Sequence, residues 1–349
     1  MKAAVVRGNC DVAVLDVPEP MITKPSEIKI KVISGAICNV TDNKVYATDH
    51  PEDNWPNYSF PFIIGHECSG RVVEMGEAVS NLQLGERIVF WTVNGKAFAD
   101  YLVIDTEESV VEAIDEAVPN DVAAIMEMAI GSARMLFTDA GEPLIKPTDA
   151  VVIIGLGPAG LIYHRIAKMM GAGKICGVGR RKLRLQKALE MGADFVVDTN
   201  KANYPEEVIS LLGGKPDVIV DATGGDVVAE MIALAKPETE MIAYGVPPFR
   251  WSDRVDEFTK ADRKPPQFPG REAACIAAKK CVEWAQSGEF GIEGAISHKL
   301  PIEEVGRGLD MCRLDRDNTL KVVISINEFK ADSGGEEQSE KMATYDVFA

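Results

Sequence analysis

Four side chains in the N-terminal part of the chain are of types that bind metal ions. Cys38 is followed by the neighbouring pair His66 and Glu67, and Glu127 comes later. Sulfur, imidazole and carboxylate together suit zinc, which takes three protein ligands in catalytic sites and four in structural sites. Taken singly each residue has an ordinary explanation, because a lone cysteine is usually buried in a core and a helical glutamate is usually solvated. Zinc is therefore a hypothesis that needs a second signal.

A second stretch, Val151 to Gly160, is of a type that binds a dinucleotide. A short β-branched run ends in three glycines spaced G-x-G-x-x-G, and an apolar-periodic helix pattern follows. The glycines permit a tight turn, let the backbone approach a pyrophosphate and allow close packing of helix and strand. The free amides and the positive end of the helix dipole then face a phosphate. The residues expected at the cofactor are Gly155, Gly157, Pro158, Ala159 and Gly160.

The glycine turn belongs to a region in which strands alternate with helices. Between residues 150 and 245, short apolar runs are separated by amphipathic helix patterns. This alternation predicts a parallel, doubly wound sheet, whose ligand crevice lies beyond the carboxyl ends of the strands. Gly155, Gly179, Thr223 and Gly245 fall at those ends.

The first 110 or so residues predict a different architecture. Short apolar runs occupy residues 3–6, 28–32, 70–75, 87–91 and 99–104. Strands at this close spacing are typical of a small barrel or sandwich. Residues 46–60 and 247–270 are rich in proline and polar side chains and are interpreted as loops. A helix is predicted over residues 119–138, with a break near Gly131.

Composition limits the partners and the location. At 349 residues the chain exceeds one hydrophobic core, so two domains are expected. A formal charge of −17 repels phosphate backbones and argues against nucleic acid. No apolar run approaches the roughly 20 residues of a membrane helix, so no membrane contact is expected. Seven cysteines without a Cys-x-x-Cys pair argue for a reducing cytoplasm.

Several longer motifs follow one another in a fixed order along residues 1 to about 327. They are Ala36-Ile-Cys38 with Thr41-Asp42, Pro61-Phe-Ile-Ile-Gly65-His66-Glu67-Cys-Ser-Gly70, Gly85-Glu-Arg-Ile-Val89, Gly155-Leu-Gly-Pro-Ala-Gly160 and Val218-Ile-Val-Asp-Ala-Thr-Gly224. Together they resemble the medium-chain zinc-dependent alcohol dehydrogenases, and within them the polyol branch that includes sorbitol and threonine dehydrogenases.

The resemblance implies an α/β protein with a GroES-like barrel that is split in sequence around a Rossmann domain. We therefore expect residues 1–138, completed by residues 290–327, to form the catalytic domain. Residues 139–289 are expected to form the Rossmann dinucleotide-binding domain. The acidic tail, residues 328–349, is expected to be disordered.

The resemblance also places one catalytic zinc on Cys38 and His66. Glu127 falls at the third-ligand position, and Glu67 is the alternative that binds in its place or alternates with it. Many relatives carry a second, structural zinc in a lobe of four cysteines, but here residues 91–97 pass directly onward, so one zinc per chain is expected. Bound zinc stabilises the alkoxide of an alcohol and acts as a Lewis acid on a carbonyl.

The path of the substrate proton departs from the family pattern. Relatives commonly carry serine or threonine two residues after the cysteine ligand, where it starts a proton relay, but this chain has Val40. Two alternatives remain, namely Thr41 if the loop shifts by one residue, or Glu67 with a water molecule.

The end of the second strand of the parallel sheet favours NADP over NAD. NAD-specific relatives carry an aspartate there that binds the adenosine ribose, whereas this chain has Gly179, Arg180 and Arg181. Glycine removes the repelling carboxylate, and adjacent guanidiniums can hold a 2′-phosphate. The alternative is two solvated arginines at the start of a helix, where the dipole disfavours cations. Lys321 matches a basic position of the family and is either a cofactor contact or a solvated lysine.

The leading hypothesis is a zinc-dependent oxidoreductase that transfers a hydride between NADP(H) and a secondary alcohol or polyol, or its ketone or aldehyde. A zinc-free quinone or enoyl reductase of the same superfamily and a non-enzymatic NADP-binding sensor or structural protein are the alternatives. The partner is a small alcohol or carbonyl compound, and a homo-oligomer, dimer or tetramer, is expected. Residues expected near the substrate are Asn39, Tyr46, Trp55, Tyr58 and Trp91.

Overall fold

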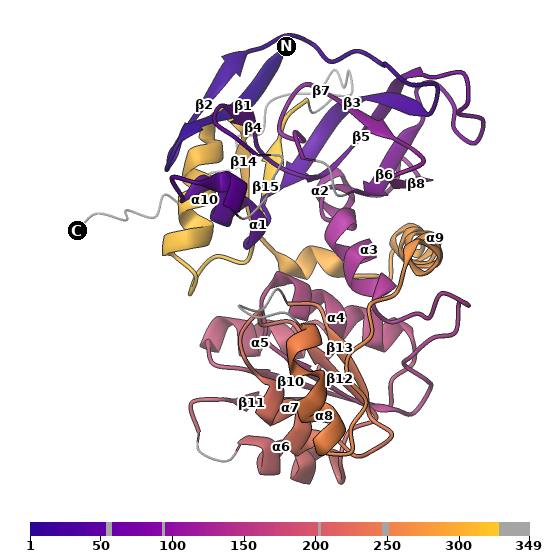
Figure 1. Ribbon diagram of the computed structural model, residues 1–349, viewed down its shortest axis with the longest axis vertical. Coiled ribbons are helices and arrows are strands. Elements are labelled where there is room, and N and C mark those ends of the chain that lie inside the picture. Colours follow the sequence, from indigo (N-terminus) through magenta and orange to yellow (C-terminus); the bar gives the residue numbers. More distant parts are fainter. Residues whose placement is uncertain (54–57, 93–94, 202–203, 246–250, 328–349) are drawn as a thin grey trace, which may run out of the picture.

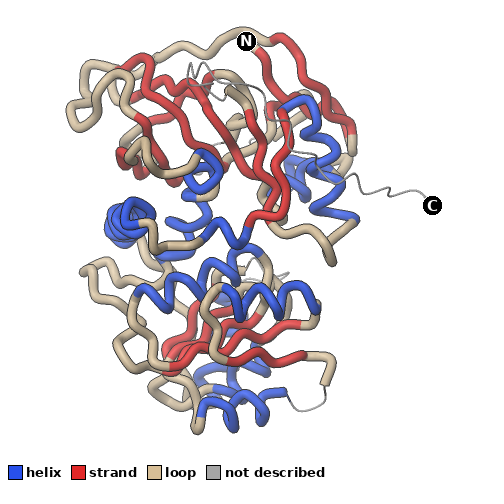
Figure 2. The backbone as a smooth tube through the Cα atoms, turned by 180° about the vertical axis from the view of Figure 1, so that it is seen from behind, coloured by secondary structure: helices blue, strands red, loops and turns tan. Residues whose placement is uncertain are grey.

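The computed structural model describes residues 1–53, 58–92, 95–201, 204–245 and 251–327. Two halves lie one above the other in Figure 1, a barrel half built from β1–β8, β14 and β15, and a parallel-sheet half built from β9–β13. Figure 2 shows the same two halves from behind. The predicted tail over residues 328–349 lies outside the described residues.

The barrel half contains a three-stranded and a seven-stranded sheet. The small sheet has the order β2-β1-β4, and the large one has the order β14-β15-β3-β5-β6-β8 with β7 also paired to β3. The strands are β1 (Lys2–Gly8), β2 (Asp11–Asp16), β3 (Glu27–Ala36), β4 (Phe62–Ile63), β5 (Glu67–Met75), β6 (Arg87–Trp91), β7 (Tyr101–Asp105), β8 (Val110–Ala113), β14 (Ile296–Pro301) and β15 (Lys321–Ser325). The five predicted strands are present, while β2, β4 and β8 are additional. Because β15 pairs with β3, the C-terminal strands return to the sheet of the N-terminal ones.

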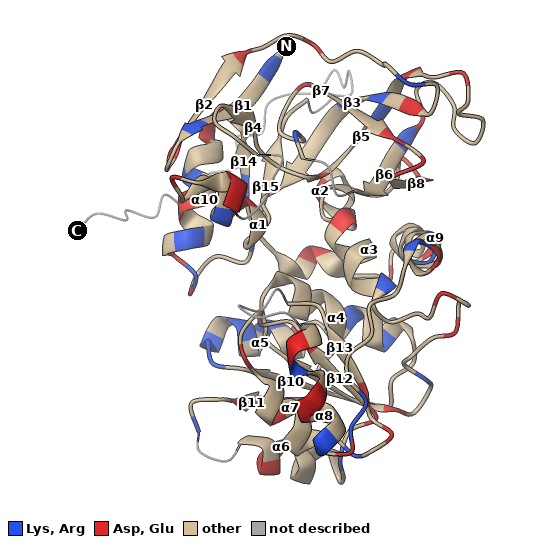
Figure 3. Ribbon diagram, in the orientation of Figure 1, with Lys and Arg blue, Asp and Glu red and all other residues tan. Residues whose placement is uncertain are grey.

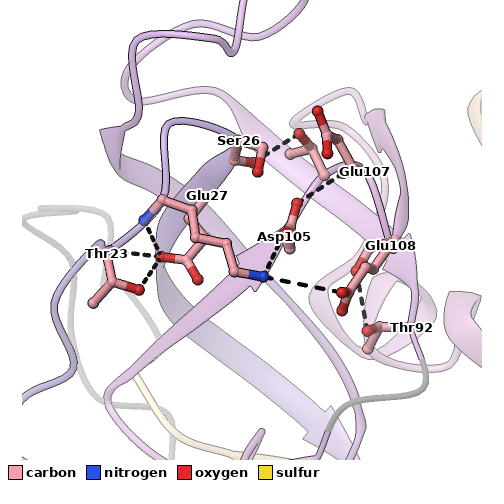
Figure 4. Close-up of polar contacts among 10 residues, drawn as sticks. Thr23, Ser26, Glu27, Thr92, Asp105, Glu107 and Glu108 are labelled. Atoms are coloured by element: carbon pink, nitrogen blue, oxygen red, sulfur yellow. Dashed lines mark hydrogen bonds and ion pairs between the residues drawn. The ribbon is translucent and has the colours of Figure 1, made fainter.

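Polar contacts hold the turn before β3 against β7. Lys24 Nζ lies 2.9 Å from Asp105 Oδ2, and the Glu27 carboxylate accepts hydrogen bonds from the backbone N–H groups of Thr23 and Lys24. Figure 4 shows this group of side chains at the edge of the sheet. Glu27 and Asp105 are partners in the β3–β7 register, so these contacts close the end of that ladder.

The parallel-sheet half has five strands in the order β11-β10-β9-β12-β13, all parallel. Its strands are β9 (Ala150–Ile154), β10 (Lys174–Gly179), β11 (Phe195–Asp198), β12 (Val218–Asp221) and β13 (Glu240–Ala243). Its helices are α4 (Pro158–Met169), α5 (Lys182–Glu190), α6 (Tyr204–Leu212), α7 (Val228–Leu234) and α8 (Val255–Lys260). Helix α9 (Arg271–Ser287) instead packs against β6 and β8 of the barrel half (Figure 1). This arrangement confirms the predicted doubly wound sheet.

Alternate residues of β9 pack on opposite faces of the sheet, as the two-residue repeat of a strand requires. Val151 and Ile153 belong to a core cluster with α4 and α9, while Val152 and Ile154 belong to a second cluster with α6, α7 and α8. The first cluster also contains residues of β6 and of helix α3 (Met126–Arg134), so one continuous apolar core joins the two halves.

Two sequence predictions of local structure were wrong. The helix over residues 119–138 is divided into α2 (Asn120–Ala124) and α3 (Met126–Arg134), so the break falls at Ile125 and not at Gly131. Gly131 lies inside α3, where an added Cβ would sit 3.2 Å from Trp91 Nε1. This glycine therefore serves close packing rather than chain reversal.

The segment predicted as a loop over residues 247–270 contains the 3₁₀ turn Trp251–Arg254 and helix α8. Phe258 of α8 is fully buried against the parallel sheet, and this single apolar anchor outweighs the polar composition around it. Helix α10 (Val305–Leu314) was also not predicted. No described helix combines the length and the apolar composition that crossing a membrane requires.

A buried histidine in α4 makes stability depend on pH. His164 is fully buried, its Nδ1 lies 2.7 Å from the carbonyl oxygen of Gly160, and burial lowers its pKa to about 4. Because the unfolded imidazole titrates near 6.5, the stability present above that pH is lost as the pH falls from about 6.5 toward 4. At pH 5 this residue should lower the free energy of unfolding by about 2 kcal/mol relative to pH 7.5.

Chemical denaturation at pH 7.5 and pH 5 tests this expectation. His164→Gln should show a smaller loss of stability between the two pH values than the unmodified protein, because glutamine does not titrate. His50→Gln, at a side chain that is 71% exposed, is the matched control and should keep the original pH dependence. If the free energy of unfolding depends on pH equally in all three proteins, His164 is not the source of the pH dependence.

Candidate metal and cofactor site

Pairing between β3 and β5 brings three candidate metal ligands together. Ala36 at the end of β3 is the register partner of Glu67 at the start of β5. Cys38 lies two residues after β3 and His66 immediately precedes β5, so the antiparallel ladder places them side by side. One ligand atom from each of Cys38, His66 and Glu67 lies within 4.8 Å of the other two.

Asp42 orients both the cysteine and the histidine. It belongs to α1 (Thr41–Tyr46) and is fully buried. Its Oδ2 accepts a hydrogen bond from the backbone N–H of Cys38 at 2.8 Å, and its Oδ1 lies 3.2 Å from His66 Nδ1. With Nδ1 facing Asp42, the Nε2 atom of His66 is left for a metal ion. A carboxylate behind a ligating histidine is a common supporting group of metal sites, and the sequence prediction did not assign Asp42 this role.

Lys321 forms a buried ion pair with Glu67. Its Nζ lies 2.7 Å from Glu67 Oε1 and donates a second hydrogen bond to the carbonyl of Ile37 at 3.0 Å. The side chains of Lys321 and Glu67 are only 1% and 2% exposed. Lys321 is therefore not a solvated lysine, and its predicted contact with a cofactor stays a prediction.

The three residues fit a zinc ion. Glu67 Oε2 is buried and has no hydrogen-bond partner among the described residues, so it offers a free lone pair beside the sulfur and the imidazole. Zinc bonds of about 2.0–2.3 Å place the ligands of one ion roughly 3.3–3.8 Å apart, so small side-chain shifts complete the set. Burial lowers the pKa of His66, but Asp42 and Cys38 raise it by more, so the net pKa lies well above its ordinary value.

Glu127 lies near this group but outside it. It is on α3, is 8% exposed, and its pKa is raised by burial and by the charge of Glu67, against the opposing effect of His66. The structure thus forms the close group with Glu67 rather than Glu127. The choice of third zinc ligand between the two acids stays a prediction.

Thr41 contacts the candidate ligand through its backbone. Its N–H donates a hydrogen bond to Cys38 Sγ at 3.4 Å, while the Val40 side chain is 43% exposed. The backbone of Thr41 thus contacts the candidate metal group, and the role of its hydroxyl in proton transfer stays a prediction.

Tyr58, one of the residues expected near the substrate, is influenced by charges of the candidate metal group. Burial raises its pKa to about 12, the charges of Asp42 and Cys38 raise it further, and that of His66 opposes them. Tyr46 and Asn39 instead donate hydrogen bonds to the carbonyls of Cys10 and Leu320. The Trp91 ring lies 4.6 Å from the Arg134 guanidinium, and Trp55 lies outside the described residues.

The glycine turn has the geometry of a phosphate-binding turn. Gly155 follows β9 with a φ of +96°, which favours glycine, and a Cβ on Gly160 would lie 1.9 Å from the Gly155 carbonyl oxygen. Pro158 and Ala159 open α4, so the helix N-terminus faces the turn. Thr223, at the end of β12, is held by hydrogen bonds from its N–H and its hydroxyl to Asp221 Oδ1.

Basic side chains gather beside this turn. Gly179 ends β10, Arg180 is exposed, and the Arg181 Nε atom lies 2.5 Å from Asp317 Oδ1. Arg184, which the sequence prediction missed, points its Nη1 to within 4.0 Å of where a Cβ on Gly157 would be. Burial and then the charge of Arg181 lower the pKa of Arg184 to about 10. Figure 3 shows basic residues on α5 and near the end of α10.

Comparisons with known proteins give consistent findings. A family model described as a zinc-binding dehydrogenase matches residues 158–260, and one described as an alcohol dehydrogenase GroES-like domain matches residues 24–114. The chain is 31% identical to the (R,R)-butanediol dehydrogenase of Bacillus subtilis over 258 residues, 65% of this chain and 72% of that protein. It is 25% identical to the sorbitol dehydrogenase of Bombyx mori, over 93% of this chain and 98% of the relative.

The fold is similar to that of a solved alcohol dehydrogenase from Thermus sp. ATN1. The TM-score is 0.77 at 22% identity, and the match covers 93% of this chain and 99% of the other. Together with the GroES-like match, this similarity confirms the two-part fold class predicted from the sequence.

Proposed function

The chain belongs to the zinc-dependent medium-chain alcohol dehydrogenase superfamily, and on that premise we propose that it is a zinc-dependent oxidoreductase. It transfers a hydride between NADP(H) and a secondary alcohol or polyol, or the corresponding ketone or aldehyde. The observation that carries the proposal is the convergence of Cys38, His66 and Glu67 within 4.8 Å, with a buried Glu67 oxygen that has no hydrogen-bond partner in the described part of the chain. A zinc-free reductase does not require such a cluster of metal-ligand side chains, so the cluster argues against that alternative.

The side chains around the metal have separate roles in the proposal. Cys38, His66 and Glu67 hold the ion, and Glu127 is the acid that exchanges with Glu67 or binds in its place. Asp42 fixes the ring of His66 and the backbone of Cys38, so that both donors keep their direction. When bound, zinc supplies a Lewis acid for negative charge on the substrate oxygen, and the nicotinamide supplies the hydride acceptor.

We place the proton path on Thr41. Val40 has no hydroxyl, whereas Thr41 is the neighbouring hydroxyl-bearing residue, and its backbone is anchored on Cys38 Sγ. Its hydroxyl receives the proton released from the alcohol and passes it toward solvent. Lys321 neutralises the charge of Glu67 and so limits the negative charge beside the reacting oxygen.

The cofactor part of the proposal rests on the end of β10. Gly179 supplies no carboxylate, and a Cβ there would lie 2.8 Å from Leu156 Cδ1. Arg180, Arg181 and Arg184 leave an excess of positive charge beside the glycine turn, and the Arg184 Nε atom is buried without a hydrogen-bond partner among the described residues. A phosphate forms charge-assisted hydrogen bonds with these guanidiniums, which are stronger than the bonds that a neutral ribose hydroxyl can accept.

A screen of secondary alcohols, polyols and their ketones with NADP and NAD tests the function. We expect reversible NADP-linked turnover on at least one polyol or secondary alcohol, followed by absorbance of the reduced nicotinamide. The same screen on Cys38→Ser is the control. If neither cofactor supports turnover of any compound by zinc-loaded protein, the oxidoreductase proposal is wrong.

A further inference from the structure

We propose that Asp317 is an intramolecular competitor for the cofactor's 2′-phosphate, holding Arg181 until that phosphate displaces it. The inference rests on the proposed function, because it concerns how a phosphorylated cofactor is recognised. It adds a specificity-determining residue from the barrel half to a site otherwise built by the parallel-sheet half.

The ion pair joins two distant parts of the chain. Arg181 follows Gly179 at the carboxyl end of β10 and immediately precedes α5. Asp317 comes from the turn between α10 and β15, 136 residues later, and its Oδ1 accepts a hydrogen bond from Arg181 Nε at 2.5 Å. The Asp317 side chain is 80% exposed and that of Arg181 is 25% exposed, so the carboxylate can leave the guanidinium without losing its hydration.

The turn that carries Asp317 is held in place by other contacts. Arg184 Nη2 donates hydrogen bonds to the carbonyls of Arg316 at 2.9 Å and Thr319 at 3.4 Å. Within the turn, the N–H of Thr319 and the side-chain amide of Asn318 donate to Asp315. Asp317 therefore keeps its position beside Arg181 without depending on their ion pair, and its carboxylate can be removed without releasing the turn.

The surrounding charges favour an additional anion. Burial lowers the pKa of Arg184, the charges of Arg181, Arg316 and Arg180 lower it further, and Asp317 opposes them. Among the charges that act most on Arg184, three are guanidiniums and one, that of Asp317, is a carboxylate. Because clustered cations repel one another, an anion that enters the cluster is stabilised by all of them.

The chemistry of the exchange explains its selectivity. A phosphate monoester carries a charge of about −1.5 to −2 and three strong acceptor oxygens, whereas a carboxylate carries one charge and two oxygens. Exposed ion pairs contribute little, so displacing Asp317 costs little. An unphosphorylated ribose has no charge with which to displace the carboxylate, and Asp317 then stays on Arg181. Asp317 thereby weakens the binding of the phosphorylated cofactor and leaves that of the unphosphorylated one unchanged.

Calorimetric titration with 2′,5′-ADP and with 5′-AMP tests the inference without any turnover. In Asp317→Asn we expect 2′,5′-ADP to bind about two- to fivefold more tightly than in the unmodified protein, and 5′-AMP to bind equally. Asp310→Asn is the matched control, because this substitution removes the same charge from another ion pair. Asp310 Oδ1 lies 2.9 Å from Arg313 Nη2 on α10. In a protein that already carries Arg181→Ala, adding Asp317→Asn should not raise the affinity for 2′,5′-ADP, because Asp317 acts through Arg181.

The outcomes separate this inference from the function on which it rests. The competitor role of Asp317 is wrong if Asp310→Asn raises the affinity for 2′,5′-ADP as much as Asp317→Asn does. It is also wrong if Asp317→Asn does not raise this affinity although 2′,5′-ADP binds better than 5′-AMP. Either result leaves the NADP assignment unchanged. Weaker 5′-AMP binding in Asp317→Asn also overturns the competitor role, because Asp317 then binds the ribose. If 2′,5′-ADP binds no better than 5′-AMP in both proteins, the NADP assignment falls together with the competitor.

Discussion

Replacing Cys38 with serine should lower kcat/KM by about a thousandfold and leave the affinity for the nicotinamide cofactor unchanged. Loss of the thiolate removes a ligand from the zinc group, and the Lewis acid contributes several kcal/mol to the reaction, which corresponds to about three powers of ten in rate. The cofactor turn at Gly155 is built by another strand and should be unaffected. Steady-state kinetics and cofactor titration on the same preparation measure both quantities.

Cys275→Ser is the matched control for this substitution. Cys275 is also a half-buried free cysteine, but it lies on α9 and contributes to no metal group among the described residues. The Cys275→Ser protein should keep both its zinc and its turnover. A Cys38→Ser protein that turns over at the original rate would show that the sulfur is not a zinc ligand.

On the proposed NADP assignment, replacing Arg180 and Arg181 together with alanine should lower the preference for NADP over NAD by about a hundredfold or more. Each charge-assisted hydrogen bond to the 2′-phosphate contributes about 1.5–3 kcal/mol, and NAD makes neither. The measurement is the ratio of kcat/KM for the two cofactors. Because both arginines are outside the metal group, kcat with saturating cofactor should change much less than the ratio.

Arg307→Ala serves as the control for the loss of an exposed arginine. Arg307 pairs with Glu304 on α10 and has a side chain that is 62% exposed. Its removal should leave the cofactor ratio unchanged. A preference for NAD in the unmodified protein would show that the two arginines are solvated residues at a helix start and that the cofactor assignment is wrong.

Local sequence patterns were sufficient to predict most of the architecture. The β-branched run before Gly155 and the glycine spacing after it depend on neighbours in sequence, so β9, the turn and α4 could be predicted directly. Strand–helix alternation then gave the parallel sheet. Cys38 and the His66-Glu67 pair could be proposed as metal ligands because they fall in longer motifs, and their convergence follows from the β3–β5 register that the structure shows.

The contacts that the sequence did not reveal are those between distant segments. Lys321 is paired with Glu67 across 254 residues, and Asp317 with Arg181 across 136. Neither pair has a periodic signal, because an ion pair depends on tertiary packing rather than on spacing. Asp42 lies in one of the sequence motifs, but its contact with His66 joins two separate segments and is seen only in the structure.

The errors in local structure have the same origin. Gly131 was predicted to break a helix, but it provides the space for Trp91 and is helical. Residues around Phe258 were predicted as a loop because of their charge, yet one buried aromatic side chain holds a short helix against the sheet. In both places packing from another element outweighed local propensity.

Zinc content measured by mass spectrometry, together with turnover before and after chelation, tests the central claim most directly. We expect about one zinc per chain, loss of turnover when the metal is removed, and recovery when zinc alone is restored. The Cys38→Ser protein should not recover under the same treatment. Full activity in a sample shown to be free of metal would contradict the zinc mechanism.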